Sequence, residues 1–139
     1  MEYADYVFCN DDEAKVFGEV LKIEQKDGLK DVAAAIAKWP KQNQARQRIA
    51  IVTCGKEPTL VAIAKEDGSV EQLAFEVPPV APELIVDTNG AGDSLVGAFI
   101  AQLVQGKSLE VAIKAGTYLS GKVIQRGGCA FPEKNEFTA

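Results

Sequence analysis

Four consecutive apolar residues, Ile49-Ala50-Ile51-Val52, place the strongest limit on how this chain can fold. A polar segment, residues 41–48, precedes them and Thr53 follows, so the run is short and contains no residue that prefers water. Uninterrupted apolar strands of this length are typical of parallel sheets, in which helices cover both faces. The run therefore predicts a buried strand in a layered α/β fold.

The residues before this strand predict one strand and two helices. Residues 3–9 combine aromatic and branched side chains and predict a short buried strand. Asn10 supplies a helix start, and apolar residues recur at helical spacing after it. A second helix is expected to open at Gly28 or Asp31 and to stop at Pro40, because proline cannot continue a helix.

The middle of the chain predicts a β-hairpin. Asp67-Gly68 is a strong turn signal between the apolar segments 60–64 and 70–77, so these segments are expected to pair as antiparallel strands. The apolar segment 84–86 predicts one more short strand. Residues 41–48 are polar and basic, and they are expected to form a solvated connection.

Two helices are expected to close the chain. The first has an apolar stripe over residues 95–104 and ends at Gly106. The second has Ser108 as its N-cap and ends at Gly127-Gly128. The sequence shows no repeat, low-complexity segment or internal boundary, so residues 1–139 are predicted to belong to one domain.

Composition and charge exclude several classes of function. The 139 residues carry a net charge of −5, which argues against a nucleic-acid or anionic-membrane surface. The absence of histidine excludes Ser–His–Asp and Cys–His catalysis and the usual zinc sites. Three widely spaced cysteines, Cys9, Cys54 and Cys129, form no disulfide framework, and no apolar run could span a membrane. The expectation is a soluble protein of the reducing cytoplasm without an obligate protein partner.

The segment with the most chemical content is Asp87-Thr88-Asn89-Gly90-Ala91-Gly92-Asp93, which lies between a predicted strand and an apolar helix. Gly90 and Gly92 let the backbone turn tightly and approach a ligand. The N–H groups from Gly90 to Asp93 lack helical partners and lie at the positive end of the helix. Gly90, Ala91 and Gly92 are therefore expected to form an anion hole for a phosphoryl group in transit.

Asp93 is the candidate catalytic base. The helix field favours its ionised form, and an ionised carboxylate beside an anion hole can accept a proton from an attacking hydroxyl. The alternative is that Asp93 only caps the helix, and the loop pattern alone gives the two interpretations about equal weight. A dinucleotide-binding fingerprint and a Walker A loop are excluded, because neither GxGxxG nor GK[ST] is present.

Residues 87–93 are similar to the DTxGAGD signature of the PfkB family of carbohydrate and nucleoside kinases. The resemblance implies that Asp93 activates the substrate hydroxyl and that Gly90 and Gly92 shape the anion hole. It also implies a ribokinase-like layered sheet with flanking helices, of which this chain supplies the C-terminal, ATP-binding and catalytic part. ATP and Mg²⁺ are the cosubstrate and cofactor that it implies.

Two further pairs of residues resemble motifs of this family. Asn10 and Glu13 have the spacing of the NxxE motif, which organises magnesium and phosphate, and Glu13 is expected to act on Mg²⁺ through water. Thr53 and Gly55 resemble the TxG element, which contacts the nucleotide phosphates. Each pair also has a plainer interpretation, since Asn10 with Glu13 could only cap a helix and Thr53 with Gly55 could only end a strand.

Within the family, the chain resembles the adenosine kinases, through Asn89 and segments 47–49 and 128–134. This likeness implies adenosine as the acceptor and AMP as the product, and it places Asn89 among the ATP- and phosphate-binding residues. The alternatives are another PfkB-type kinase for a sugar or nucleoside, and a catalytically silent nucleotide-binding module. The resemblance to the superfamily further implies a monovalent cation, K⁺, at Asp87 and the carbonyl of Asn89.

The likeness also places a purine ring near the small residues of the last helix, for which close helix packing is the alternative. It covers less than half of a complete family member. The remainder of such a kinase supplies most of the sheet, the lid and most nucleoside contacts. The chain alone is therefore expected to be inactive, because it would hold the base and the phosphate site without the pocket that orients the acceptor.

Overall fold

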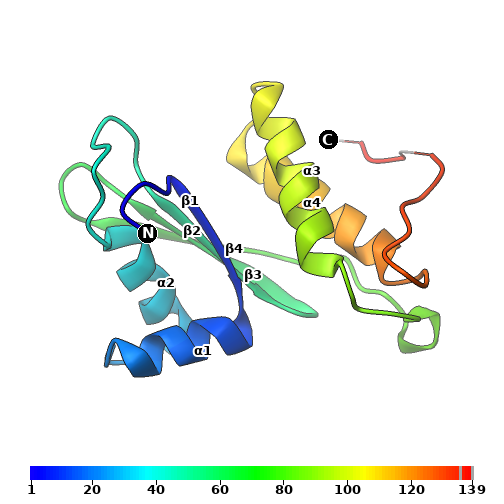
Figure 1. Ribbon diagram of the computed structural model, residues 1–139, viewed down its shortest axis with the longest axis horizontal. Coiled ribbons are helices and arrows are strands. Elements are labelled where there is room, and N and C mark those ends of the chain that lie inside the picture. Colours follow the sequence, from blue (N-terminus) through cyan, green and yellow to red (C-terminus); the bar gives the residue numbers. More distant parts are fainter. Residues whose placement is uncertain (135, 139) are drawn as a thin grey trace. The chain divides into compact units, whose positions relative to one another are not determined.

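The computed structural model describes residues 1–134 and 136–138 of the chain. They divide into two compact units, Met1–Glu76 and Val77–Ala139 (Figure 1). The first unit is a sheet with two helices, and the second consists mainly of two longer helices and the loops that connect them. The order of strands and helices confirms the predicted α/β class.

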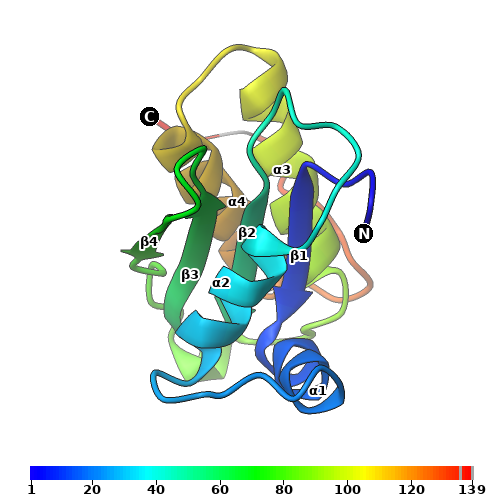
Figure 2. The same ribbon diagram turned by 90° about the vertical axis from the view of Figure 1, so that its left-hand side faces the viewer.

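The first unit contains, in chain order, β1 Tyr6–Asn10, α1 Asp11–Val20, α2 Leu29–Lys38, β2 Ile49–Cys54, β3 Glu57–Ala64 and β4 Val70–Phe75. The strands form one sheet in the order β1-β2-β3-β4 (Figure 2). β1 runs parallel to β2, whereas β2 with β3 and β3 with β4 are antiparallel pairs. The predicted first strand is confirmed, but it begins at Tyr6 and extends to Asn10, and none of its five residues is fully buried, contrary to the prediction.

β2 is an interior strand, as its apolar sequence predicts. Ala50, Ile51 and Val52 are no more than 1 % exposed. In the parallel pairing of β1 with β2, Asn10 lies opposite Thr53. The carboxyl ends of these two strands therefore meet at one edge of the sheet, and this edge carries the residues of both predicted phosphate motifs.

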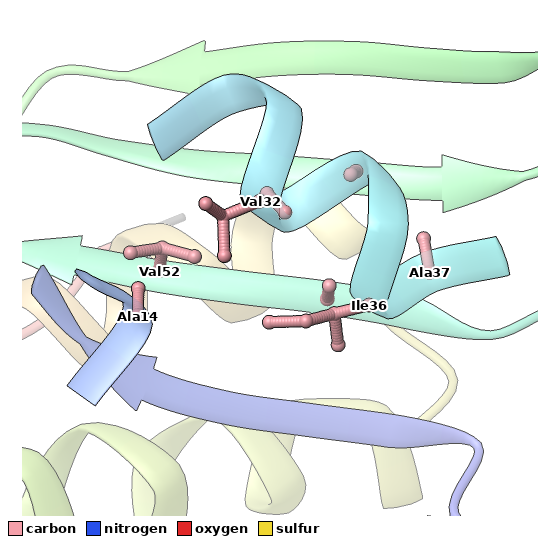
Figure 3. Packing of buried hydrophobic residues seen from close by; sticks show 8 residues of the cluster. Ala14, Val32, Ile36, Ala37 and Val52 are labelled. Atoms are coloured by element: carbon pink, nitrogen blue, oxygen red, sulfur yellow. The ribbon is translucent and has the colours of Figure 1, made fainter. Parts of the chain in front are cut away.

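Helices α1 and α2 bury their apolar faces in one cluster on the sheet (Figure 3). Val32 and Ile36 of α2 and Ala14 of α1 meet Val52 of β2, and each of these side chains is no more than 1 % exposed. Full burial of a valine or isoleucine side chain contributes about 1.5–3 kcal/mol. The helical spacing of apolar residues in the sequence thus predicts the core of this unit correctly, and α2 ends at Lys38, before Pro40.

The predicted solvated connection 41–48 is wrong for its two ends. Arg48 is 1 % exposed, and its guanidinium donates to backbone carbonyls of the N-terminal segment, at Met1 and Ala4, and of α2, at Ile36. The Lys41 side chain is 7 % exposed and forms an ion pair with Asp5. Sequence composition could not reveal this, because the acceptors are backbone carbonyls for Arg48 and the Asp5 carboxylate for Lys41, and only the folded chain brings them close.

Two hairpins connect the antiparallel strands. The predicted one, around Asp67-Gly68, is confirmed, and the Asp67 carboxylate accepts from the Ser69 N–H at 2.9 Å. The structure adds a second, between β2 and β3, because Cys54 pairs with Glu57 across Gly55 and Lys56. Gly55 has φ of +61°, a value that side chains disfavour. The glycine of the predicted phosphate motif is therefore also required by this tight turn.

The second unit contains the short 3₁₀ helix η1 Pro82–Leu84 and the helices α3 Ala91–Val104 and α4 Leu109–Val123. The predicted end of α3 is confirmed, since Gly106 follows it with φ of +74°, and the predicted N-cap of α4 is confirmed, since the Ser108 hydroxyl accepts from the Val111 N–H. The predicted end of α4 at Gly127-Gly128 is wrong, because the helix ends at Val123. α3 and α4 lie side by side (Figure 1). Gly116 permits this approach, because a Cβ there would lie 2.9 Å from both Cγ and the carbonyl oxygen of Leu95. Close packing therefore accounts for this small residue of the last helix.

The predicted strand at residues 84–86 is wrong. Leu84 ends η1, and the N–H of Val86 donates to the carbonyl of Ile124 at 2.8 Å instead of entering a ladder. A strand requires a neighbouring strand, and the described residues of this unit contain none. An apolar triplet alone does not reveal whether such a neighbour exists.

Candidate active site

The glycine loop, residues 87–93, leads directly into α3. Gly90 is the N-cap of this helix and has φ of 76°, in the left-handed region that glycine adopts without steric cost. Ala91 and Gly92 open the helix, and Asp93 lies in its first turn. The sequence therefore predicts both the turn and the position of Asp93 correctly.

The backbone N–H groups at the start of α3 differ in their hydrogen bonding. The Ala91 N–H donates to the Thr88 carbonyl at 3.3 Å, within the loop turn. The Ser94 N–H donates to the Gly90 carbonyl at 2.9 Å and is the first to follow the helical pattern. Gly92 and Asp93 precede it, at positions where a helix leaves its N–H groups without internal partners. These two groups are the best placed to receive an anion.

The carboxylate of Asp93 is not used as a helix cap. Gly90, which has no side chain, occupies the N-cap position, and no side-chain hydrogen bond caps α3 within the described residues. Asp93 is exposed, whereas the next residue, Ser94, is 4 % exposed and bonds back to the Ala91 carbonyl. The capping interpretation of Asp93 therefore lacks the hydrogen bond that it requires, and the carboxylate lies exposed at the start of the helix.

Asp87, at the start of the glycine loop, accepts two backbone hydrogen bonds. Its Oδ1 accepts from the Asn89 N–H at 2.9 Å, and its Oδ2 accepts from the Gly128 N–H at 3.3 Å. These two bonds, that of Asn89 first, lower the pKa of the Asp87 carboxyl below its ordinary value. The side chain is thus an ionised acceptor that joins two segments far apart in the sequence.

Asn10 and Glu13 form a capping box at the start of α1. The Glu13 N–H donates to Asn10 Oδ1 at 2.7 Å, and the Asn10 N–H donates to Glu13 Oε2 at 2.8 Å. The capping interpretation of this pair is therefore realised in the structure. Both side chains remain exposed at the edge where β1 and β2 end. The capping box uses Asn10 Oδ1 and Glu13 Oε2, so the side-chain NH₂ group of Asn10 and the second carboxylate oxygen of Glu13 take no part in it.

The neighbourhood of this capping box contains two thiols. Burial, together with the nearby Glu13 carboxylate and Cys54, raises the pKa of the Cys9 thiol to about 11. Burial also raises the pKa of Cys54, which lies between Thr53 and Gly55. Both thiols are neutral at pH 7 and act as small apolar residues, as expected for Cys54 from the sequence.

The predicted site residues fall into two groups. Asn10, Glu13, Thr53 and Gly55 lie at one edge of the sheet in the first unit, and Asp87 to Asp93 lie in the second unit. Within residues 1–134 and 136–138, no three His, Cys, Asp or Glu side chains are placed to hold a metal ion. None of the helices in the same described part has the length and apolar character that a membrane span requires.

Sequence reasoning gave Gly128 and Cys129 no contact with the glycine loop, to which the structure brings them. Gly128 binds Asp87, and a Cβ on Gly90 would lie 2.6 Å from Cys129 Sγ. The signal that could have found them is weak. It consists of two adjacent glycines after the last helix, which a helix stop explains equally well.

Known proteins resemble this chain over nearly its whole length. The sequence model of the pfkB family carbohydrate kinases matches residues 1–136 of this chain. Two proteins of Arabidopsis thaliana, adenosine kinase 1 and adenosine kinase 2, are 42 % and 44 % identical to it over 137 residues, 99 % of this chain and 38 % of each relative. The crystal structure of Anopheles gambiae adenosine kinase in complex with P1,P4-di(adenosine-5) tetraphosphate has a TM-score of 0.85 and 39 % identity, over 96 % of this chain and 38 % of that chain.

The chain thus spans 38 % of the length of the relatives that it matches, and the likeness extends through both of its units. The glycine loop and the Asn10–Glu13 pair lie inside the matched region. A match of this extent settles the family, and the chain belongs to the pfkB family of carbohydrate kinases.

Proposed function

We propose that the protein to which this chain belongs transfers the γ-phosphoryl group of ATP to the 5′-hydroxyl of adenosine, giving AMP and ADP. The observation that carries the proposal is the exposed Asp93 carboxylate, in the first turn of a helix whose N-cap is glycine and has no side-chain cap. The relatives named adenosine kinase, at 42 % and 44 % identity, favour adenosine as the acceptor. The cytoplasm is its proposed location.

In the proposed reaction, Asp93 takes the proton of the 5′-hydroxyl, and the oxygen attacks the γ-phosphorus in line. The bond between the γ-phosphorus and the bridging oxygen breaks, and ADP leaves with that oxygen. The N–H groups of the loop from Gly90 to Asp93 donate to the oxygens on which negative charge accumulates, with Gly92 and Asp93 the most available. Asp93 thus combines a base with two adjacent donors in one helical turn.

The nucleotide phosphates are proposed to contact Asn10, Glu13, Thr53 and Gly55, with Asn89 of the glycine loop. Mg²⁺ bound with ATP supplies positive charge that offsets the charge of the transferred group. The residues fit a metal that is carried by the nucleotide, because magnesium keeps several waters and Glu13 has one carboxylate oxygen outside the capping box. K⁺ is proposed at Asp87 and the Asn89 carbonyl, where the carboxylate is ionised and retains lone pairs.

Glu13→Gln separates the metal role of Glu13 from its capping role. Glutamine also completes a capping box, so the free energy of unfolding should stay within about 0.5 kcal/mol of the wild-type value. Loss of the charge should raise the Mg²⁺ concentration for half-maximal rate by about threefold or more. Kinetic titrations with Mg²⁺ measure this, and Glu19→Gln on the same helix is the matched control. Equal magnesium dependence of the two variants would leave Glu13 with capping alone.

The substrate assignment is tested with the complete protein in a coupled assay of ADP release. Adenosine, other nucleosides and ribose are compared at saturating ATP and Mg²⁺. The proposal expects the highest kcat/KM with adenosine, and faster turnover of ribose would assign the protein to a sugar-kinase branch of the family. No turnover of any acceptor, together with retained ATP binding, would indicate a silent nucleotide-binding module.

A further inference from the structure

The C-terminal turn, residues 127–129, lies against the glycine loop. The approach begins at the end of α4, where the Ile124 carbonyl accepts from the N–H groups of Val86 and Asp87 at 2.8 and 3.2 Å. It continues at Gly128, whose N–H donates to Asp87 Oδ2 at 3.3 Å. Three hydrogen bonds therefore hold residues 86–87 to a segment almost forty positions later.

The contact between Cys129 and Gly90 closes this arrangement on the other side of the loop. A Cβ built on Gly90 would lie 2.6 Å from Cys129 Sγ and 3.0 Å from Cys129 Cβ, so the turn leaves no room for a side chain at the N-cap of α3. Cys129 has φ of 58°, although it is not glycine. Such a conformation costs about 1–2 kcal/mol for a residue with a side chain, so the surrounding contacts must hold it.

Asp87 is the residue in which these contacts converge. Its N–H donates to the carbonyl of Ile124, the C-cap of α4, one carboxylate oxygen accepts from the glycine loop at Asn89, and the other accepts from the C-terminal turn. Only the N-cap Gly90 and the first helical residue Ala91 separate Asn89 from Gly92, so the direction of the anion-binding N–H groups depends on how this anchor is held. No other carboxylate in the described residues is hydrogen-bonded to both segments.

We propose that Asp87 is a positioning residue, which clamps the C-terminal turn on the glycine loop and so fixes the orientation of the Gly92 and Asp93 groups for phosphoryl transfer. The proposal rests on the proposed function, in which those groups meet the substrate. Loss of the clamp leaves the base and the donors present but displaced, and misplacement of reacting groups by about 1 Å can cost on the order of 10²-fold in rate. The effect should therefore fall on kcat more than on substrate binding.

The matched control is Asp67, in the β3–β4 turn. Its carboxylate also accepts from the N–H of the residue two positions later at 2.9 Å, but it contacts only its own turn. In the complete protein, Asp87→Ala should lower kcat by about 10- to 100-fold and change the KM values for ATP and adenosine by less than about threefold. Asp67→Ala should leave kcat unchanged. Asp87→Asn keeps an acceptor for Asn89 and should lie between the wild type and Asp87→Ala.

Hydrogen exchange supplies a measurement that does not depend on activity. In Asp87→Ala, peptides over residues 124–131 should exchange faster than in the wild type, because the Gly128 N–H has lost its acceptor. Asp67→Ala should leave these peptides unchanged. Equal exchange in the two variants, or a kcat of Asp87→Ala equal to that of Asp67→Ala, would overturn the proposal.

If Asp87→Ala does not fold, Cys129→Gly provides a second test of the clamp. Glycine removes the conformational cost at this position, so a purely structural role predicts unchanged or higher thermal stability with unchanged kcat. The clamp predicts lower kcat, by about fivefold or more, without loss of stability, because the thiol no longer holds the loop. Asp93→Asn, measured in the same assay, distinguishes a failure of the proposed function from a failure of the clamp. If Asp93→Asn retains full activity, the proposed function fails; if only the Asp87 and Cys129 variants retain it, the clamp fails.

Discussion

Replacing Asp93 with asparagine is expected to lower kcat of the complete protein by about 10²–10⁴-fold, the usual contribution of a general base. The KM for ATP should change little, because the N–H groups at the start of α3 remain in place. Asparagine has nearly the shape of aspartate and preserves the helix turn, but it cannot accept the hydroxyl proton at neutral pH. Steady-state kinetics with varied adenosine and ATP measure both parameters.

A matched control for this substitution is Asp31→Asn. Asp31 also lies in the first turn of a helix, α2, where its Oδ2 accepts from the Asp27 N–H at 2.7 Å. A helix-terminal aspartate that is only structural should affect stability and leave kcat unchanged, and this is the behaviour expected of Asp31→Asn. If Asp93→Asn behaved in the same way, Asp93 would be a helix-terminal acid without a catalytic role. The absence of a side-chain cap on α3 argues for the opposite result.

The parts of the site that depend on local sequence could be predicted. The turn at Gly90, the first-turn position of Asp93 and the helix start at Asn10 each follow from a few adjacent residues, because capping and left-handed turns are decided within one helical turn. The sequence also offered both interpretations of the Asn10–Glu13 pair. The structure realises the capping box and leaves the second interpretation open to experiment, since one side chain can serve both purposes.

Contacts between distant residues could not be predicted. The bond from the Gly128 N–H to Asp87 joins residues 41 positions apart, and the bond from Arg48 to the Ala4 carbonyl joins residues 44 positions apart. Neither a glycine pair nor a single arginine in a basic segment indicates a partner in sequence. The predicted strand at residues 84–86 is wrong for the same reason, because a strand forms only where a neighbouring strand pairs with it. Such features follow from the topology of the fold, which a single sequence pattern does not specify.

Arg48 is the residue whose loss should destabilise the first unit most. Its Nε donates to the Ala4 carbonyl at 2.9 Å, and its terminal nitrogens donate to four further carbonyls, of Met1, Ile36, Trp39 and Pro40. Three of these acceptors lie at or just beyond the C-terminal end of α2, where a positive charge also favours the helix dipole. One buried guanidinium thus joins the N-terminal segment to the end of α2.

Arg48→Ala is expected to lower the free energy of unfolding by about 3–5 kcal/mol, because several buried carbonyls would lose their donor and no small side chain can replace five N–H groups. Arg48→Lys should recover only part of this loss, since an ammonium group has three donors and lacks the planar fork. The matched control is Arg46→Ala, because the Arg46 side chain is 74 % exposed and, among the residues that the structure describes, pairs with Asp5 alone, at 3.9 Å. Urea unfolding of the complete protein, followed by a probe in this unit such as Trp39 fluorescence, measures all three variants. Equal midpoints for Arg48→Ala and Arg46→Ala would show that the carbonyl groups find water instead, and that Arg48 does not hold this end of the sheet together.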